Sequence, residues 1–263
     1  RISIMFTITP MVVAKGPQRE KSRFTYMHGC GEKVDIPYTT WLIQGSGLTA
    51  LVDTGCSAED YRTHICQGGA LMYAGEKFAD VEEIKPLAEH LKERGLTFDD
   101  IDLVLQTHVD WDHCMNTRHF MKSKILLQRT EWAKLPIHPL FKGTYAPGYI
   151  YEEIAKRNLQ FLDGDYHVTK GLDLIYTPGH SPGGQSVVVD TKDGRYVIAG
   201  MCTIRENFYP SEETRRSTGL PVIPTGSHMD PIQVYDSMIR ILNAGDRVLP
   251  FHDSANFTMG TLG

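Results

Sequence analysis

The chain lacks the features that mark nucleic-acid-binding, membrane-spanning or disulfide-stabilised proteins. Its 263 residues carry 27 Lys and Arg against 32 Asp and Glu, a net charge of −5, and no run of basic residues. We therefore expect no nucleic-acid partner. No apolar stretch approaches the roughly 18–20 residues that cross a bilayer, so we expect no membrane segment. The five cysteines are an odd number without a Cys-x-x-Cys pair, which argues against a disulfide framework and favours a reducing, cytoplasmic location.

The chain also lacks internal repeats, low-complexity segments and linker-like tracts, so we expect one domain over residues 1–263. Short apolar runs predict strands at 2–7, 40–43, 48–52, 101–105, 172–176, 186–189, 196–199 and 247–250. Apolar residues at helical spacing predict helices over 81–91, with Gly95 as the stop, and over 231–243. Several predicted strands end on polar residues. This pattern indicates two sheets with a site along their shared edge and helices outside, an αββα sandwich of the α/β class.

Candidate metal ligands are concentrated in one short segment. The run Thr-His-Val-Asp-Trp-Asp-His over 107–113 directly follows the predicted strand 101–105 and holds two imidazoles and two carboxylates: His108, Asp110, Asp112 and His113. Three further candidates follow later predicted strands: His180, Cys202 and His252. Imidazole and carboxylate donors together suit zinc, iron or manganese. Loops that open from rigid strand ends can converge on one ion.

The run 108–113 resembles the His-x-His-x-Asp-His signature of the metallo-β-lactamase superfamily, with Asp110 in place of its second histidine. Within that superfamily the chain is most similar to the N-acyl homoserine lactonases. The similarity lies in Ile36-Pro37, in Leu-Val-Asp-Thr-Gly at 51–55, in Asp-Gly-Asp at 163–165, in the segment 174–183 around Thr-Pro-Gly-His-Ser-Pro-Gly, and in Arg-Glu-Asn-Phe at 205–208. The resemblance implies an αββα fold with a two-metal site.

Carried over position by position, the resemblance assigns six of these candidate ligands to two metal ions. His108, Asp110 and His180 would bind the first ion, and Asp112, His113 and His252 the second. We expect Zn2+, with Mn2+ or Fe2+ as alternatives because Asp110 adds an oxygen donor, at one or two ions per chain. The lactonase branch also suggests a homodimer.

The same resemblance implies a metal-dependent hydrolase whose partner is a small-molecule substrate. The enzyme would open a lactone or a related cyclic ester or amide by attack of a metal-bound hydroxide. Asp112 would be the catalytic residue that both ligates and orients this hydroxide, and Asp110 would share the reacting centre. Asp53 or Thr107 is expected to fix the tautomer of a ligating histidine.

Two alternatives at the centre stay open. The aspartate that bridges both metals in the family falls at Gly200 or Met201, depending on the anchor used for the alignment, and neither supplies a carboxylate. Cys202 is then either a replacement thiolate ligand or a buried bystander. Asp110 is either a ligand or turned away from the site.

Candidate substrate contacts are mostly aromatic. Trp111 lies inside the metal motif, and Tyr145 and Tyr149 lie in a segment rich in aromatics, Pro and Gly. These tyrosines either line the pocket or pack a long loop. Thr203 stands where the lactonases carry a tyrosine that contacts the substrate carbonyl, and Tyr209, a few residues later, is a candidate to supply the phenol instead. An apolar or ring-shaped substrate fits such a wall.

Two other functions remain as alternatives. The His-x-carboxylate-x-Asp-His form also resembles the di-iron members of the superfamily, which handle dioxygen or nitric oxide. The chain would then be an iron-dependent redox enzyme, or another non-hydrolytic metalloenzyme. The other alternative is a non-catalytic member of the superfamily that binds a ligand or partner without turnover.

Overall fold

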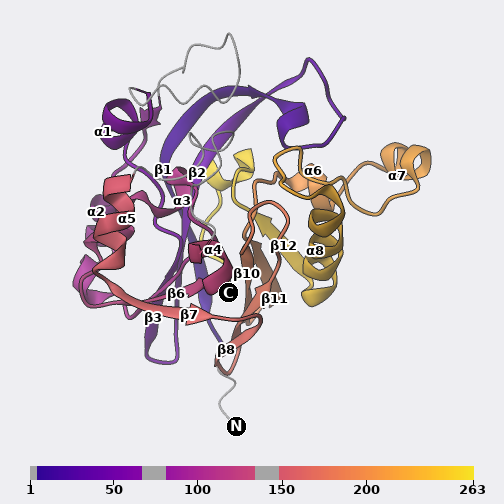
Figure 1. Ribbon diagram of the computed structural model, residues 1–263. Coiled ribbons are helices and arrows are strands. Elements are labelled where there is room, and N and C mark those ends of the chain that lie inside the picture. The colour runs from indigo at the N-terminus through magenta and orange to yellow at the C-terminus, as the bar shows by residue number, and fades with distance from the viewer. Residues whose placement is uncertain (1–4, 67–80, 134–147) are drawn as a thin grey trace.

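The computed structural model describes residues 5–66, 81–133 and 148–263. Two β-sheets face one another between outer helices (Figure 1). The first sheet has seven strands in the order β4-β1-β2-β3-β5-β6-β7, and the second has five in the order β12-β11-β10-β9-β8. The strand bounds are β1 Thr7–Glu20, β2 Lys33–Gly45, β3 Leu48–Val52, β4 Glu82–Glu83, β5 Leu103–Leu105, β6 Lys124–Gln128, β7 Asn158–Leu162, β8 Tyr166–Thr169, β9 Leu172–Tyr176, β10 Gln185–Thr191, β11 Gly194–Ala199 and β12 Arg247–Pro250.

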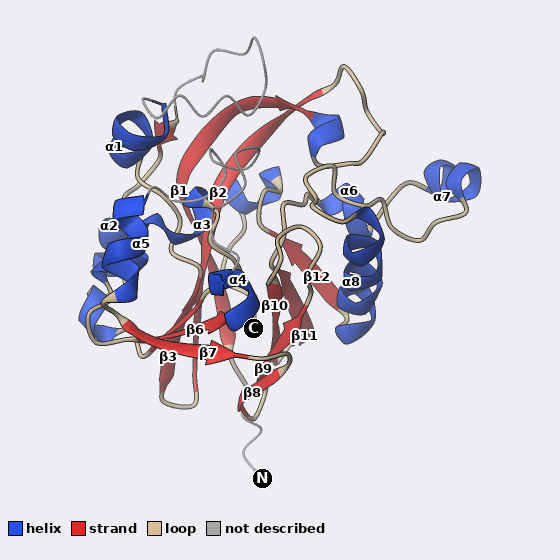
Figure 2. Cartoon of the chain, in the orientation of Figure 1, coloured by secondary structure: helices blue, strands red, loops and turns tan. Residues whose placement is uncertain are grey.

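Helices cover the outer faces of both sheets (Figure 2). Helices α1, α2 and α5 lie on the side of the first sheet, α6 and α8 lie on the side of the second, and α7 stands away from both sheets. The helix bounds are α1 Ala58–Asp60, α2 Leu87–Lys92, α3 Trp111–Cys114, α4 Arg129–Ala133, α5 Gly148–Ala155, α6 Arg205–Phe208, α7 Glu212–Thr218 and α8 Pro231–Ala244. Of the helices that the structure describes, none has the length and apolar character needed to span a membrane.

The predicted αββα sandwich is confirmed by the way the apolar side chains divide into layers. Between the sheets, Trp41 and Leu126 of the first sheet pack in one buried cluster with Val187 of the second. A second cluster joins the outer face of the first sheet to α2 through Leu91. A third joins the second sheet to α8 through Met238. Each sheet is therefore buried on both faces, which explains why its strands read as continuous apolar runs.

Strand direction places the loops that carry the candidate ligands. Strands β3, β5, β6 and β7 are parallel to one another. In the second sheet, β10 is antiparallel to both β9 and β11, and β11 is parallel to β12, so β9, β11 and β12 point the same way. The carboxyl ends of parallel strands meet at one edge of a sheet, where open α/β folds build their sites.

Two predicted elements begin later than expected. The helix predicted over 81–91 begins at Leu87, because Pro86 keeps the residue before it out of the helical region. Glu82 and Glu83 instead pair with β1 as the short strand β4. The strand predicted at 2–7 begins at Thr7, and residues 1–4 lie outside the described part of the chain. The late helix matches its prediction: Pro231 opens it and Asp230 caps it by accepting two backbone N–H groups.

Candidate metal centre

Loops at the carboxyl ends of three strands bring the six predicted histidine and aspartate ligands together. The loop after β5 and the helix α3 carry four of them, the loop after β9 carries His180, and the turn after β12 carries His252. Their donor atoms form two groups of three in which every atom lies within 4.8 Å of the others. The first group is His108, Asp110 and His180, and the second group is Asp112, His113 and His252.

The first group has the spacing of ligands around a single ion. Asp110 Oδ2 lies 3.3 Å from His180 Nε2 and 3.6 Å from His108 Nε2. The two Nε2 atoms are 3.3 Å apart. Ligand atoms at about 2.1 Å from a tetrahedral zinc ion are about 3.4 Å from one another. The Asp110 carboxylate therefore faces both imidazoles and is not turned away from them.

The second group is slightly wider. Asp112 Oδ2 lies 3.5 Å from His113 Nε2 and 3.7 Å from His252 Nε2. The rings of His108 and His113 are 4.0 Å apart between centroids, so the two groups are neighbours. Each group offers two imidazole nitrogens and one carboxylate, a set that zinc, manganese and iron(II) all accept.

Each of the four imidazoles is anchored through its other ring nitrogen. His108 Nδ1 lies 2.8 Å from Thr107 Oγ1, and His113 Nδ1 lies 2.7 Å from Asp53 Oδ2. The Nδ1 atoms of the remaining two histidines lie 2.6 Å and 3.1 Å from backbone carbonyl oxygens, in the pairs His180–Ser227 and His252–Pro37. An oxygen partner on Nδ1 favours the tautomer that leaves Nε2 free to bind metal. The expectation that Asp53 and Thr107 hold histidine rings is met by these contacts.

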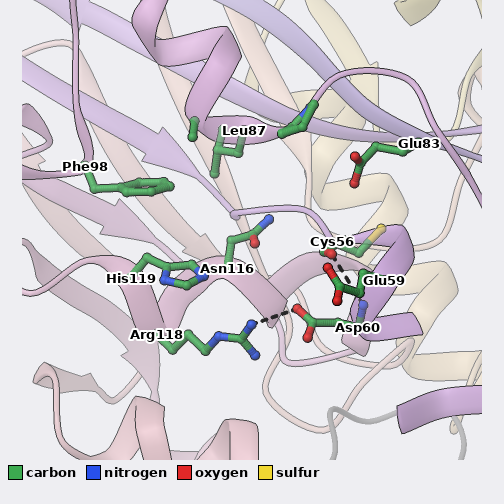
Figure 3. Close-up of a pocket in the computed structure, with 12 residues that line it drawn as sticks. Cys56, Glu59, Asp60, Glu83, Leu87, Phe98, Asn116, Arg118 and His119 are labelled. Carbon is green, nitrogen blue, oxygen red and sulfur yellow. Dashed lines mark hydrogen bonds and ion pairs between the residues drawn. The ribbon is translucent and has the colours of Figure 1, made fainter. Parts of the chain in front are cut away.

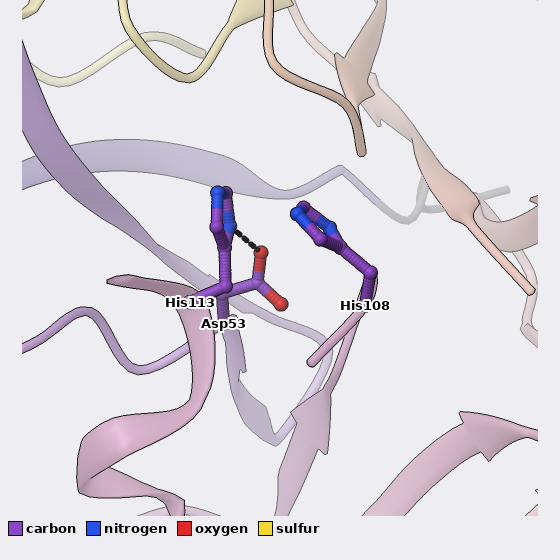
Figure 4. Close-up of side chains that lie close together, drawn as sticks. All are labelled: Asp53, His108 and His113. Atoms are coloured by element: carbon purple, nitrogen blue, oxygen red, sulfur yellow. Dashed lines mark hydrogen bonds and ion pairs between the residues drawn. The ribbon is translucent and has the colours of Figure 1, made fainter. Parts of the chain in front are cut away.

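Asp53 is the main support beneath the candidate centre, and Figure 4 shows its carboxylate between the rings of His108 and His113. Its buried carboxylate accepts hydrogen bonds from Thr107 N, Thr107 Oγ1, Gln106 Nε2 and His113 Nδ1 at 2.6–2.9 Å. Its backbone has a positive φ of 58°, a conformation that costs a non-glycine residue about 1–3 kcal/mol. Asp53 also lies near His108 and His113 in a third donor group. Because it contacts His113 through Nδ1 and not Nε2, it serves that ring as a support.

Burial favours the neutral, metal-binding form of three of the four imidazoles. Burial lowers the pKa of His108 to about 4 and the pKa values of His113 and His252 to about 3, so these rings are neutral near pH 7. Burial and the negative charge of Asp110 raise the pKa of Asp112 to about 8. Burial opposes ionisation of Asp110, but His108 and His180 outweigh it and lower the pKa of Asp110 below its usual range.

Comparison with known families decides the classification. A family model described as the metallo-beta-lactamase superfamily matches residues 35–244. The chain belongs to the metallo-beta-lactamase superfamily. The matched residues include the run 108–113 and His180, while His252 lies after them.

Relatives within the superfamily carry a consistent name. The N-acyl homoserine lactonase of Bacillus thuringiensis is 28% identical over 180 residues, which are 68% of this chain and 69% of that protein. The N-acyl homoserine lactonase AiiB of Agrobacterium fabrum is 27% identical over 188 residues, which are 67% of each chain.

A solved structure shares the fold over nearly its whole length. It is a B. thuringiensis AiiA mutant with N-decanoyl-L-homoserine bound at its active site. The TM-score is 0.71 at 22% sequence identity, and the match covers 97% of this chain and 96% of that one.

The bridging aspartate that the superfamily resemblance places at Gly200 or Met201 does not fit at Gly200. A Cβ atom on Gly200 would lie 1.8 Å from Gln185 O and 2.7 Å from Thr107 Cβ. Met201 is buried in the cluster beneath α8. Cys202 is half-buried, and burial together with the negative charge of Asp112 raises the pKa of its thiol well above the usual range. Within the described part of the chain, Cys202 belongs to none of the donor groups.

The predicted substrate residues have different surroundings. Trp111 is half-buried, and its ring lies 5.1 Å from Tyr38 and 4.8 Å from Tyr61 between centroids. Thr203 is buried, with its hydroxyl 3.4 Å from Met201 O. The Tyr209 hydroxyl accepts a hydrogen bond from Val248 N, in β12, at 2.9 Å. The structure therefore gives Thr203 and Tyr209 structural partners. Tyr145 and the side chain of Tyr149 lie outside the described residues.

Several supporting residues were not predicted from the sequence. Ser227 and Pro37 act through backbone carbonyl oxygens, so their side-chain type carries no signal. Gln106 donates its amide to Asp53 and accepts a hydrogen bond from Thr117. A buried amide directly after an apolar strand was the one available sign of this role.

A separate cavity of about 270 Å³ lies between α1 and α2 and is also lined by residues of the segment 116–119 (Figure 3). Phe98 and His119 stack at one side of it, and Arg118 pairs with Asp60 at 2.8 Å. No predicted ligand lines this cavity, so it is distinct from the metal centre.

Proposed function

We propose that the chain is a metal-dependent hydrolase that opens a lactone or a related cyclic ester or amide. The observation that most strongly supports this is the pair of adjacent donor groups, each with two imidazoles and one carboxylate at the spacing of ligands around one ion. Relatives that match about two thirds of the chain are named N-acyl homoserine lactonases. Their name gives the bond type that we expect this site to cleave.

The chain's own residues would position the reactants. Ions held by the two groups would polarise the substrate carbonyl and lower the pKa of a water molecule from about 16 towards 7. Asp112, whose Oδ2 faces two imidazoles, would orient this water and accept its proton. The ionised Asp110 carboxylate would supply the negative charge of the first donor group. The half-buried ring of Trp111 would form part of the wall against an apolar or ring-shaped substrate.

We propose zinc as the bound ion, at one or two per chain, with manganese and iron(II) as the alternatives. Asp110 gives the first group an oxygen donor, which suits manganese and iron(II) better than a third imidazole would. Because Gly200 supplies no carboxylate between the groups, we expect them to bind their ions with unequal affinity.

One observation supports a second candidate function. Each donor group consists of two histidines and one carboxylate, the ligand set of non-haem iron(II) oxygenases. An iron-dependent redox enzyme would consume oxygen during turnover, whereas the hydrolase would open its ring without consuming oxygen.

The decisive experiment is a substrate panel on purified protein loaded with zinc, manganese or iron(II). The panel contains lactones, lactams, cyclic imides and linear esters, and the controls are Asp110→His and His180→Ala. We expect turnover of a lactone or a cyclic relative that His180→Ala abolishes. If His180→Ala leaves every activity unchanged, the proposed site is wrong.

Three further proposals concern the protein's organisation. We propose one domain, a homodimer and a cytoplasmic location; the free thiols of Cys30, Cys56, Cys114 and Cys202 suit a reducing compartment. A single unfolding transition, sedimentation velocity and cell fractionation test these in turn.

A further inference from the structure

Glu131 is a buried carboxylate that the proposed reaction does not use. It lies on α4, directly after β6, and only 1% of its surface is exposed. Burial and the negative charge of Asp110 raise the pKa of Glu131 to about 7. No positively charged group among the described residues is among the causes that set this pKa. A carboxyl group is rarely buried without a cation unless hydrogen bonds satisfy it.

Both oxygens of Glu131 are satisfied by backbone N–H groups from two different ligand loops. Val109 N donates to Oε1 at 3.1 Å, and Gly183 N donates to Oε2 at 2.8 Å. Val109 lies between His108 and Asp110 in the sequence, and Gly183 lies three residues after His180. One side chain therefore connects the loop after β5 to the loop after β9, and so connects the two sheets at the metal centre.

The two loops are tightly packed where Glu131 holds them. A Cβ atom on Gly183 would lie 2.2 Å from Glu131 N, so the loop after β9 closes directly onto the backbone of α4. Val109 is buried, and its carbonyl oxygen lies 3.5 Å from both the Cys114 Sγ and the Tyr151 hydroxyl. The peptide between two ligands of the first group is thus held from both sides.

The second group draws no ligand from the loop after β9, so Glu131 does not join two loops of that group. Its imidazoles are anchored by Asp53 and by the carbonyl oxygen of Pro37, and His252 comes from the turn after β12. Removal of the Glu131 carboxylate should therefore disturb the two groups to different extents.

We propose that Glu131 is a positioning residue that sets the separation of the loops carrying His108, Asp110 and His180, and thereby the affinity of the first group for its ion. This inference rests on the proposed function only in requiring that the first group binds metal. Supporting groups of this kind typically change metal affinity by about 10–100-fold when they are altered.

The test variant is Glu131→Gln, which keeps the shape of the side chain. Its single carbonyl oxygen can accept one N–H, while its NH2 group faces the other, so one of the two connections is lost. We expect Zn2+ to bind the first group about 10–100-fold more weakly and the second group within about threefold of wild type. Glu152→Gln, which alters an exposed glutamate on α5, is the matched control and should leave both affinities unchanged.

The two groups are resolved by making the change in two backgrounds. In His252→Ala, zinc binding reports the first group, and Glu131→Gln should weaken it. In His180→Ala, zinc binding reports the second group, and Glu131→Gln should leave it nearly unchanged. Affinities are measured by competition with a chromogenic chelator, and the thermal midpoint of the metal-free protein is recorded for each variant. A lowered midpoint with equal zinc affinity in the His252→Ala background overturns the inference, because it shows a merely structural role.

A measurement on the wild-type protein covers the case in which Glu131→Gln fails to fold. The amide protons of Val109 and Gly183 should exchange with solvent at least about 100-fold more slowly than unprotected amides. Rapid exchange of either amide overturns the inference. If the wild-type chain binds no zinc, the proposed function fails and this inference with it. If the wild type binds zinc and Glu131→Gln binds it equally, only this inference fails.

Discussion

Replacing Gly200 with alanine tests the geometry at the turn that lacks the bridging aspartate. The added Cβ would lie 1.8 Å from Gln185 O and 2.9 Å from Gln185 C, and 2.7 Å from Thr107 Cβ. Contacts under 3.0 Å essentially never occur for real Cβ atoms, so the backbone must move. Gln185 cannot move freely, because its own N–H donates to Thr107 O and its side chain donates to the backbone oxygens of Gln106 and Leu126.

The expected cost follows from this confinement. Inserting atoms into a filled core typically costs about 1–3 kcal/mol. Because the obstacle here is the backbone of β10 and not a flexible side chain, we expect about 3 kcal/mol. For a chain of this size, each kcal/mol lowers the unfolding midpoint by roughly 2–4 °C, so Gly200→Ala should unfold about 6–12 °C lower. Gly200→Asp should be destabilised at least as much as Gly200→Ala, because it adds the same Cβ atom, and so should not restore a bridging carboxylate.

Calorimetry of the metal-free protein measures this change. The matched control is Gly260→Ala, because a Cβ atom there meets nothing within 4 Å, and its midpoint should stay within about 2 °C of wild type. A Gly200→Ala midpoint within that same range would contradict the reasoning, since it would mean that the turn can open to accept a side chain.

Three other predictions concern the ligands and their support. Burial and the negative charge of Asp110 raise the pKa of Asp112 to about 8, so below that pH Asp112 holds a proton that the metal must displace. Zinc affinity should therefore rise up to about tenfold per pH unit from pH 6 to 8 and level off above pH 8. A zinc affinity that calorimetry finds independent of pH would contradict the assignment of Asp112 as a ligand. Asp110→His should shift the zinc-to-manganese affinity ratio of the first group about tenfold or more towards zinc, and an unchanged ratio in competition dialysis would show that Asp110 does not ligate. Asp53→Asn should weaken metal binding about 10–100-fold, and wild-type affinity in the folded variant would remove Asp53 from the support of His113.

The convergence of the candidate ligands could be predicted from the sequence, because both their chemistry and their position at strand ends are visible there. His180 and His252 follow apolar runs that became β9 and β12, and the run 108–113 follows β5. Each is a residue type that binds metal, at the end of an element that the apolar pattern predicts. The αββα layering could be predicted for the same reason, since the superfamily motifs and the strand pattern agree.

The support of the centre could be predicted only where a side chain supplies it. Asp53 and Thr107 are polar residues at strand ends and were recognisable. The anchors of His180 and His252 are carbonyl oxygens, which every residue carries. Their role depends on where the segment around Ser227 and the start of β2 come to lie, and this depends on long-range packing.

The long ribbon of β1 and β2 was largely missed for a physical reason. The sequence of β1 contains Pro10 and Pro17 and ends in polar residues, features that weaken a strand. Pairing with β2 compensates, because the register shifts between Gly16 and Arg19 and so accommodates Pro17. The start of the helix predicted over 81–91 was wrong for a different reason. The apolar residues have helical spacing, but Pro86 keeps the residues before it out of the helix.

The central claim is that the two donor groups hold metal, and metal content measures it most directly. The purified protein is incubated separately with zinc, manganese and iron(II) and then dialysed. Its metal content is measured by inductively coupled plasma mass spectrometry. We expect one to two ions per chain with at least one of these metals, and a lower content in His180→Ala. A chain that retains none of the three metals would contradict the claim.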